Sequence, residues 1–226
     1  MNKNIPIVSN DNFPYEAYKD IVDKYIEKDS RELNFQNRAI LVMLETILLD
    51  TDVEVVDTSI LYDRGKRNSP TLKNRQFTAK YSAPPDLLLV RNWHLNNRDN
   101  KVEYLAAIEV KSPRSTEAIS GKKVQNYNKN TIKQVFKTLS LETIPLVILT
   151  DSCRWHFLRE EEDLNNASLS FDLLDENKHW KKETIEIDDT LGDILDLKGP
   201  NNTIEKEPKE WDDIKTTILD VVKGSN

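Results

Sequence analysis

Apolar positions recur at helical spacing in the first part of the chain. Between Tyr15 and Lys28 they return every three or four residues, and between residues 35 and 49 they form a broader apolar stripe. This spacing puts the apolar side chains on one side of a helix, where they can be buried. The pattern predicts two amphipathic helices at the start of the chain.

The middle of the chain has β-branched and continuous apolar runs instead. Residues 53–61 predict a strand, and a loop rich in Gly, Pro, Asn and basic residues follows at 63–74. After a short predicted strand at 76–81, the diproline Pro84-Pro85 introduces a strand at 87–93. A polar hairpin near 96–100 then returns the chain as a strand at 102–111, which indicates an antiparallel pair.

The remaining pattern completes a mixed α/β architecture. The predicted elements are a helix at 124–139, a buried strand at 146–150, a strand at 154–159, an acidic loop at 160–166, edge strands at 169–174 and 184–187, and helices at 191–197 and 211–222. The core order is α-β-β-β-α-β, which favours a mixed sheet with helices on both faces. We expect one domain over 1–197, with its core at about 32–160, and a linker and C-terminal helix over 198–226.

Composition narrows the class of protein. The chain has 226 residues, of which 31% are charged and 38% are hydrophobic, as expected for a single globular domain. The N-terminal segment is polar and no apolar run reaches membrane-spanning length, so we expect a cytoplasmic protein with no membrane partner. The lone Cys153 predicts neither a disulfide nor a zinc site. His94, His156 and His179 lack metal-ligand spacing and are expected at the surface or on an edge strand.

One strand ends with charged residues that need an explanation. The run LAAIEVKSP, at 105–113, places Glu109 and Lys111 among apolar residues, on the same face of the predicted strand. An antiparallel strand that starts at Asp86 can bring a second carboxylate beside Glu109. Two carboxylates and a lysine suit Mg²⁺ and the hydrolysis of a phosphodiester. The alternatives are a salt bridge on the exposed face of an edge strand and a structural ion network.

These residues resemble the signature of the PD-(D/E)XK nuclease superfamily. Pro85-Asp86 followed by Glu109-Val110-Lys111 matches its proline-aspartate and acid-x-lysine strands. VKSP at 110–113, a glutamine-bearing helix and LVILTDSCRWHFL at 146–158 are most similar to the N-terminal nuclease domain of type I restriction enzyme motor subunits. The resemblance covers residues 32–160. It implies a restriction endonuclease-like fold, with Asp86 and Glu109 as metal ligands and Lys111 as a catalytic residue.

The resemblance also implies two further site residues. The family adds an acid from the first core helix, for which Glu45 is the candidate, with Glu32 and Gln36 competing and a solvated helix face as the alternative for Glu45. The glutamine is assigned to Gln134, as a fourth catalytic residue, in preference to Gln125.

The net charge of −7 does not indicate a nucleic-acid partner. However, basic residues gather on both sides of the acid-x-lysine strand in the sequence. A solvated surface is the ordinary explanation of such runs. The proposed DNA-binding residues are Arg64, Lys66, Arg67, Lys73, Arg75, Arg114, Lys122 and Lys123.

The sequence therefore predicts a DNA endonuclease that requires Mg²⁺, for which Mn²⁺ can substitute, in restriction or other defence against foreign DNA. The resemblance implies 5′-phosphate and 3′-hydroxyl products. The chain carries no motor motif, so it acts alone, as a homodimer, or with a separate targeting or motor partner. The alternative is a catalytically silent nuclease fold that binds nucleic acid or protein.

Overall fold

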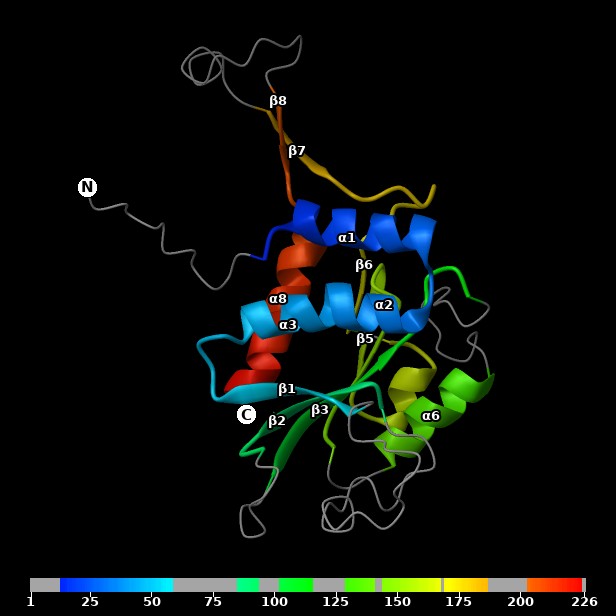
Figure 1. Ribbon diagram of the computed structural model, residues 1–226, viewed down its shortest axis with the longest axis vertical. Coiled ribbons are helices and arrows are strands. Elements are labelled where there is room, and N and C mark those ends of the chain that lie inside the picture. Colours follow the sequence, from blue (N-terminus) through cyan, green and yellow to red (C-terminus); the bar gives the residue numbers. More distant parts are fainter. Residues whose placement is uncertain are drawn as a thin grey trace, which may run out of the picture.

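A six-stranded mixed sheet lies at the centre of the molecule. The computed structural model describes residues 13–58, 85–93, 102–115, 129–140, 144–167, 169–186 and 203–224. Its strands are β1 (Val53–Asp57), β2 (Leu87–Arg91), β3 (Glu103–Val110), β4 (Val147–Thr150), β5 (Arg154–Leu158) and β6 (Leu169–Asp172), in that spatial order. Neighbouring strands are antiparallel except for the parallel pair β3 and β4. Figure 1 shows helices on both faces of this sheet, which confirms the predicted mixed α/β class.

Two helical segments open the chain, as the apolar spacing predicts. The first, α1, spans Tyr15–Lys28 and has the predicted bounds. The second begins three residues earlier than predicted and runs as α2 (Glu32–Phe35), the π-helical segment η1 (Gln36–Ile40) and α3 (Leu41–Ile47). π-Helical turns inside an α-helix are frequent at functional sites. Here the π-helical turn begins at Gln36, whose side chain is buried.

The parallel pairing of β3 with β4 depends on a crossover through α6 (Lys129–Leu139). Parallel neighbours cannot be joined by a tight turn, so the chain must return across one face of the sheet before it enters β4. Val135 of α6 packs against Val147 and Leu149 of β4. Ile148, between them on the strand, faces the opposite core. The sheet is therefore covered on both faces at its centre.

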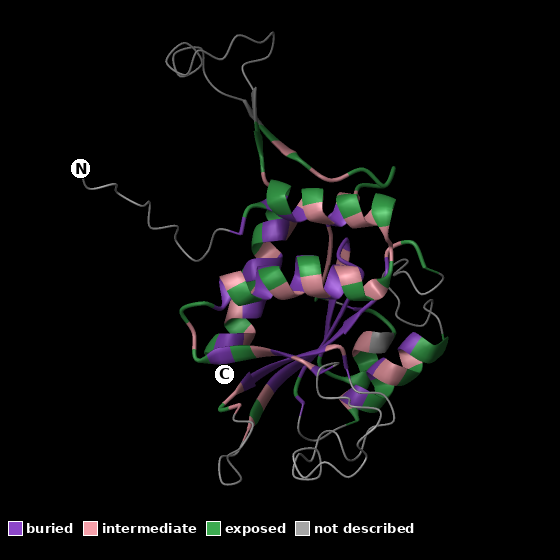
Figure 2. Cartoon of the chain, in the orientation of Figure 1, coloured by how far each residue is buried: buried purple, intermediate pink, exposed green. Residues whose placement is uncertain are grey.

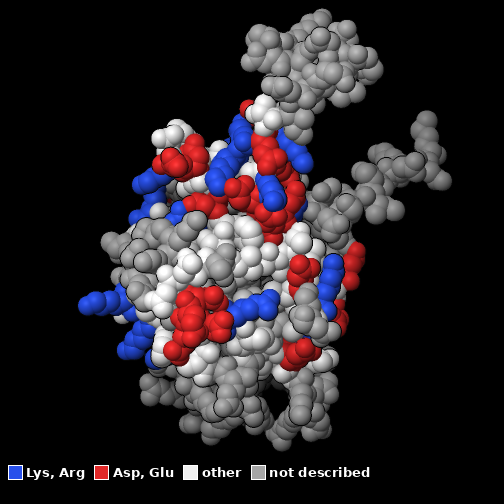
Figure 3. Space-filling view, turned by 180° about the vertical axis from the view of Figure 1, so that it is seen from behind, with Lys and Arg blue, Asp and Glu red and all other residues white. Residues whose placement is uncertain are grey.

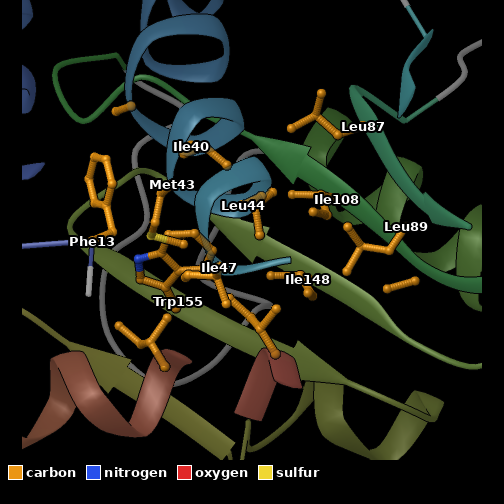
Figure 4. Packing of buried hydrophobic residues seen from close by; sticks show 14 of the residues in the cluster. Phe13, Ile40, Met43, Leu44, Ile47, Leu87, Leu89, Ile108, Ile148 and Trp155 are labelled. Atoms are coloured by element: carbon orange, nitrogen blue, oxygen red, sulfur yellow. The ribbon is translucent and has the colours of Figure 1, made fainter. Parts of the chain in front are cut away.

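The main core lies between the sheet and the helices α1, α3 and α8 (Lys209–Lys223). In Figure 4, Met43, Leu44 and Ile47 of α3 point toward the strands that carry Ile108, Ile148 and Trp155. Figure 2 shows the central strands as a continuous buried region and the outer faces of the helices as exposed. Residues 105–110 of β3 are all buried, as expected for a central strand.

The C-terminal third differs most from prediction. The expected strand at 184–187 forms as β7 (Glu183–Glu186), but it pairs with β8 (Thr203–Lys206) in a separate hairpin rather than joining the main sheet. β8 lies inside the predicted linker, between the expected helices at 191–197 and 211–222. The acidic loop at 160–166 contains the 3₁₀ turn η4 (Glu161–Leu164), closed by a capping box between Glu160 and Asp163. The predicted helix at 191–197 lies outside the described residues.

The histidine and tryptophan of β5 are both interior residues. Trp155 is fully buried in the main core. His156 is also fully buried, so the expectation of a surface or edge position is wrong for this histidine. β5 is an inner strand, paired with β4 and β6, and successive residues on it face opposite layers. Among the helices that the structure describes, none has the length and apolar character needed to cross a bilayer.

Candidate active site

The ends of three adjacent strands bring the predicted carboxylates together. Leu87 pairs with Ile108 in the antiparallel register of β2 and β3, and the Asp86 amide donates a hydrogen bond to the Ile108 carbonyl at 3.0 Å. This register sets Asp86 opposite Glu109. The predicted pairing is confirmed. Asp57, the last residue of β1, pairs with Leu87 on the other side and so lies at the same end of the sheet.

Asp86 is held in place by the backbone of β3. Its Oδ2 accepts a hydrogen bond from the Val110 amide at 2.7 Å. Burial raises the pKa of the Asp86 carboxyl, against the lowering effects of this hydrogen bond and of Lys111. The Asp86 carboxyl is therefore held in place by the backbone. Because its pKa is raised, ionising it costs free energy unless a further cation is near.

Glu109 and Lys111 form a buried hydrogen-bonded pair at the end of β3. Glu109 is 6% exposed and Lys111 is 3% exposed, and Lys111 Nζ donates to Glu109 Oε1 at 2.6 Å. The alternative of a salt bridge on an exposed strand face is therefore wrong. Burial, and then the charge of Asp86, raise the pKa of Glu109 to about 8 despite Lys111. Burial alone would lower the pKa of Lys111, but Glu109 and Glu32 outweigh it, and this pKa is raised.

Glu32 is the acid of the first core helix that reaches Lys111. Its Oε2 lies 3.7 Å from Lys111 Nζ. The Ser112 hydroxyl donates to the Ser30 carbonyl at 2.6 Å, which ties the chain after β3 to the start of this helix. Glu45 is exposed on α3. At 1.5 Å per residue it lies about 20 Å along the helix from Glu32, so the structure does not bring Glu45 to the cluster.

Gln36 contributes an amide rather than a charge. It is 3% exposed, and its Nε2 donates to Asp57 Oδ1 at 3.2 Å and to the Asp86 carbonyl at 3.4 Å. The side chain thus links the end of β1 to the start of β2. Sequence reasoning did not assign Asp57 to the site. The available signal was its position as the polar residue that ends the run Val53–Asp57.

Gln134 lies on the helix that covers the same face of the sheet as Glu109. Glu109 pairs with Leu149, and Leu149 packs against Val135 of α6. Gln134 is half-buried, and its amide makes no hydrogen bond within the described part of the chain. The competing Gln125 lies outside the described residues.

Most of the predicted DNA-binding residues cannot be placed. Arg114 is exposed just after β3. The others lie outside the described residues: Arg64, Lys66, Arg67, Lys73, Arg75, Lys122 and Lys123.

The donor set at the site suits a small hard cation. Within the described ranges, no three His, Cys, Asp or Glu side chains are arranged to hold a metal ion by themselves. Mg²⁺ does not need such a group, because it keeps several waters and binds through one or two carboxylates together with substrate phosphates. Asp86 and Glu109 are two adjacent carboxyls with raised pKa values. A divalent cation would offset the repulsion between their ionised forms.

Comparison with known proteins does not assign the chain to a family. No family model matches it, and searches of curated proteins and of solved structures give no significant match.

Proposed function

We propose that this protein is a Mg²⁺-dependent endodeoxyribonuclease with a restriction endonuclease-like fold. One observation carries the proposal: two converging carboxyls, Asp86 and Glu109, stand beside a buried lysine at the end of a central strand. A buried charge cluster is expensive to maintain, and strongly shifted pKa values are more frequent at functional sites than elsewhere.

The arrangement of elements supports the same proposal. A helix, three antiparallel strands, a crossover helix and a strand parallel to the third follow in the order that the resemblance to the PD-(D/E)XK superfamily implies. The acid-x-lysine pair ends β3, and Asp86 immediately precedes β2. Pattern and fold are therefore consistent with one catalytic architecture.

Asp86 and Glu109 would hold the cation. When bound, Mg²⁺ would lower the pKa of a bound water and neutralise charge that develops on the phosphate. The hydrogen bond from the Val110 amide fixes the Asp86 carboxylate before any cation arrives. Little reorganisation is then required on binding, which favours affinity.

Lys111 supplies a fixed positive charge beside the carboxylates. Glu109 and Glu32 raise its pKa, so the ammonium keeps its proton at neutral pH. The short contact to Glu109 and the longer one to Glu32 hold Nζ on two sides. From this position the ammonium can donate a hydrogen bond to a phosphate oxygen and stabilise the transition state.

The proposed reaction is hydrolysis of one phosphodiester bond. A water oxygen forms a bond to phosphorus while the bond from phosphorus to the leaving oxygen breaks, and a proton from the water ends on that leaving oxygen. The resemblance implies that the leaving oxygen is O3′, which gives a 5′-phosphate and a 3′-hydroxyl.

Cleavage of supercoiled plasmid tests this proposal. Wild type is compared in EDTA, Mg²⁺ and Mn²⁺ with Asp86→Asn and Lys111→Ala, while Glu103→Gln serves as the control because Glu103 is an exposed carboxylate at the other end of β3. We expect wild type to nick the plasmid with either metal and not in EDTA. The cleavage rate should fall at least about 100-fold in both site variants. Unchanged cleavage in the site variants, with Glu103→Gln behaving alike, would refute the assignment.

A second function has two observations in its favour. Lys111 Nζ already lies 2.6 Å from Glu109 Oε1 and so offsets the charge of this carboxylate. Among the described residues, no three His, Cys, Asp or Glu side chains are placed to hold a metal ion by themselves. Both facts suit a nuclease fold that binds partners through other surfaces and keeps the cluster as a structural ion network. In that case Lys111→Ala would unfold the protein, and a folded wild type would bind no divalent cation.

A further inference from the structure

One helix presents a face that is basic and aromatic at once. The 11 residues of α6 include Lys129, Lys133 and Lys137 but no acid. All three lysines are exposed, and Phe136 between them is 45% exposed. In Figure 3 basic side chains project from the edge of the molecule where α6 lies. We call Lys129, Lys133, Phe136 and Lys137 the α6 basic face.

Some lysines of the other long helices, α1 and α8, lie beside acidic residues. Lys19 of α1 lies within 4 Å of Glu16, Asp20 and Asp23. Lys215 of α8 pairs with Asp212 at 3.0 Å. The chain carries a net charge of −7, whereas the 11 residues of α6 include three lysines and no acid.

The spacing of the four residues makes a continuous strip. With 3.6 residues per turn they fall within about 100° of the helix circumference, and the lysines follow one another at about 6 Å along the axis. Phe136 lies at one edge of this arc, next to the line of lysines. An exposed aromatic ring flanked by ammonium groups can stack on a base while the lysines contact the backbone phosphates.

The strip is also placed to guide a strand to the candidate active site. β3 and β4 are parallel, so the crossover carries the chain back along the sheet from the end where β3 terminates. The start of α6, at Lys129, is therefore directed toward the end of the sheet that carries Glu109 and Lys111.

We propose that the α6 basic face binds a single-stranded segment of the DNA substrate. This inference rests on the proposed nuclease function and adds the strand state of the bound DNA. Phe136 selects an unpaired strand, because a base in a duplex has both of its faces covered by stacking. Duplex DNA can use the lysines but not the ring.

Fluorescence anisotropy in EDTA separates binding from cleavage. The probes are an oligo-dT strand and a duplex of equal length, titrated with full-length wild type, Phe136→Ala and Lys129→Ala/Lys133→Ala. The control is Lys28→Ala/Lys223→Ala, which removes two exposed lysines from the ends of α1 and α8. Circular dichroism establishes that each variant is folded.

We expect Phe136→Ala to lose about tenfold in affinity for oligo-dT and little for the duplex. The double lysine variant should bind both probes more weakly. For oligo-dT, the slope of log affinity against log salt concentration should become shallower by about 0.7 for each lysine removed. The control should bind like wild type. Absence of wild-type binding at low salt, or equal binding by all variants, would overturn the inference. Retained plasmid cleavage in that event would leave the nuclease proposal standing.

Discussion

Asp86 and Glu109 face each other across β2 and β3, and the Asp86 carboxylate accepts its hydrogen bond from Val110, the residue that follows Glu109. Burial raises the pKa of both carboxyls, and each is sensitive to the charge of its neighbours. The fold therefore brings together two groups that favour either a proton or a cation.

The pKa of Glu109 makes the metal-free protein less stable at alkaline pH. Between about pH 6.5 and pH 8 the folded state keeps a proton on Glu109, whose pKa is about 8, while the unfolded chain has released it. The free energy of unfolding must fall as the pH rises through this window, by up to about 1.4 kcal/mol per pH unit. Urea unfolding in EDTA measures this slope.

Two comparisons isolate the contribution of Glu109. Glu109→Gln has no proton to lose and should show a smaller slope over the same window. Mg²⁺ should raise the stability of wild type most near pH 8, the upper end of this pH range, because a cation that binds only the folded state stabilises it. A wild-type stability that does not change over this window would contradict the buried carboxyl pair.

His156 produces the opposite slope at lower pH. Burial, and then Arg154, lower its pKa to about 4. Between about pH 4 and pH 6.5 the unfolded chain binds a proton on His156 that the folded state excludes, so the contribution of neutral His156 to stability is lost as the pH falls. His156→Gln should lose less stability than wild type across this window in urea unfolding. Identical pH profiles for the two proteins would show that His156 is not a neutral core residue.

Glu32 is the helix acid expected to support catalysis. Glu32→Gln removes one of the charges that hold Lys111, so we expect about a 10- to 100-fold fall in plasmid cleavage, as for the loss of a supporting partner. Glu45→Gln is the matched control on the same helix and should cleave like wild type. The reverse result would favour the initial assignment of Glu45.

Trp211 tests whether the C-terminal helix is part of the core. Its ring is fully buried and lies 4.7 Å from the Tyr18 ring, measured between centroids. Trp211→Ala should lower the free energy of unfolding by about 3–5 kcal/mol. Phe136→Ala, which truncates a half-exposed aromatic residue, should cost less than about 1 kcal/mol. Similar costs for the two variants would mean that α8 contributes little to stability.

Local patterns were sufficient for the elements that position the site. Tyr15–Lys28 has helical apolar spacing and forms α1 with those bounds, and the apolar run before Glu109 forms a buried strand. The pairing of Asp86 with Glu109 was predictable because an antiparallel hairpin joins their strands and fixes the side-chain face.

The features that sequence reasoning missed depend on contacts between distant segments. The four residues of β8 include one apolar side chain and therefore give little periodicity from which to predict a strand. Their pairing with β7 supplies the hydrogen bonds. Glu32 and Gln36 compete with Glu45 in any single-sequence comparison. Only the packed helix shows that Glu32 reaches Lys111 and that Gln36 reaches Asp57.

Isothermal titration of Mn²⁺ into wild type and Glu109→Gln at about pH 8 tests the central claim most directly. We predict one saturable site in wild type, with proton release that makes the measured heat depend on the ionisation enthalpy of the buffer. Glu109→Gln should lose this site while remaining folded. Absence of Mn²⁺ binding to wild type, or equal binding to both proteins, would contradict the assignment of Asp86 and Glu109 as a metal site.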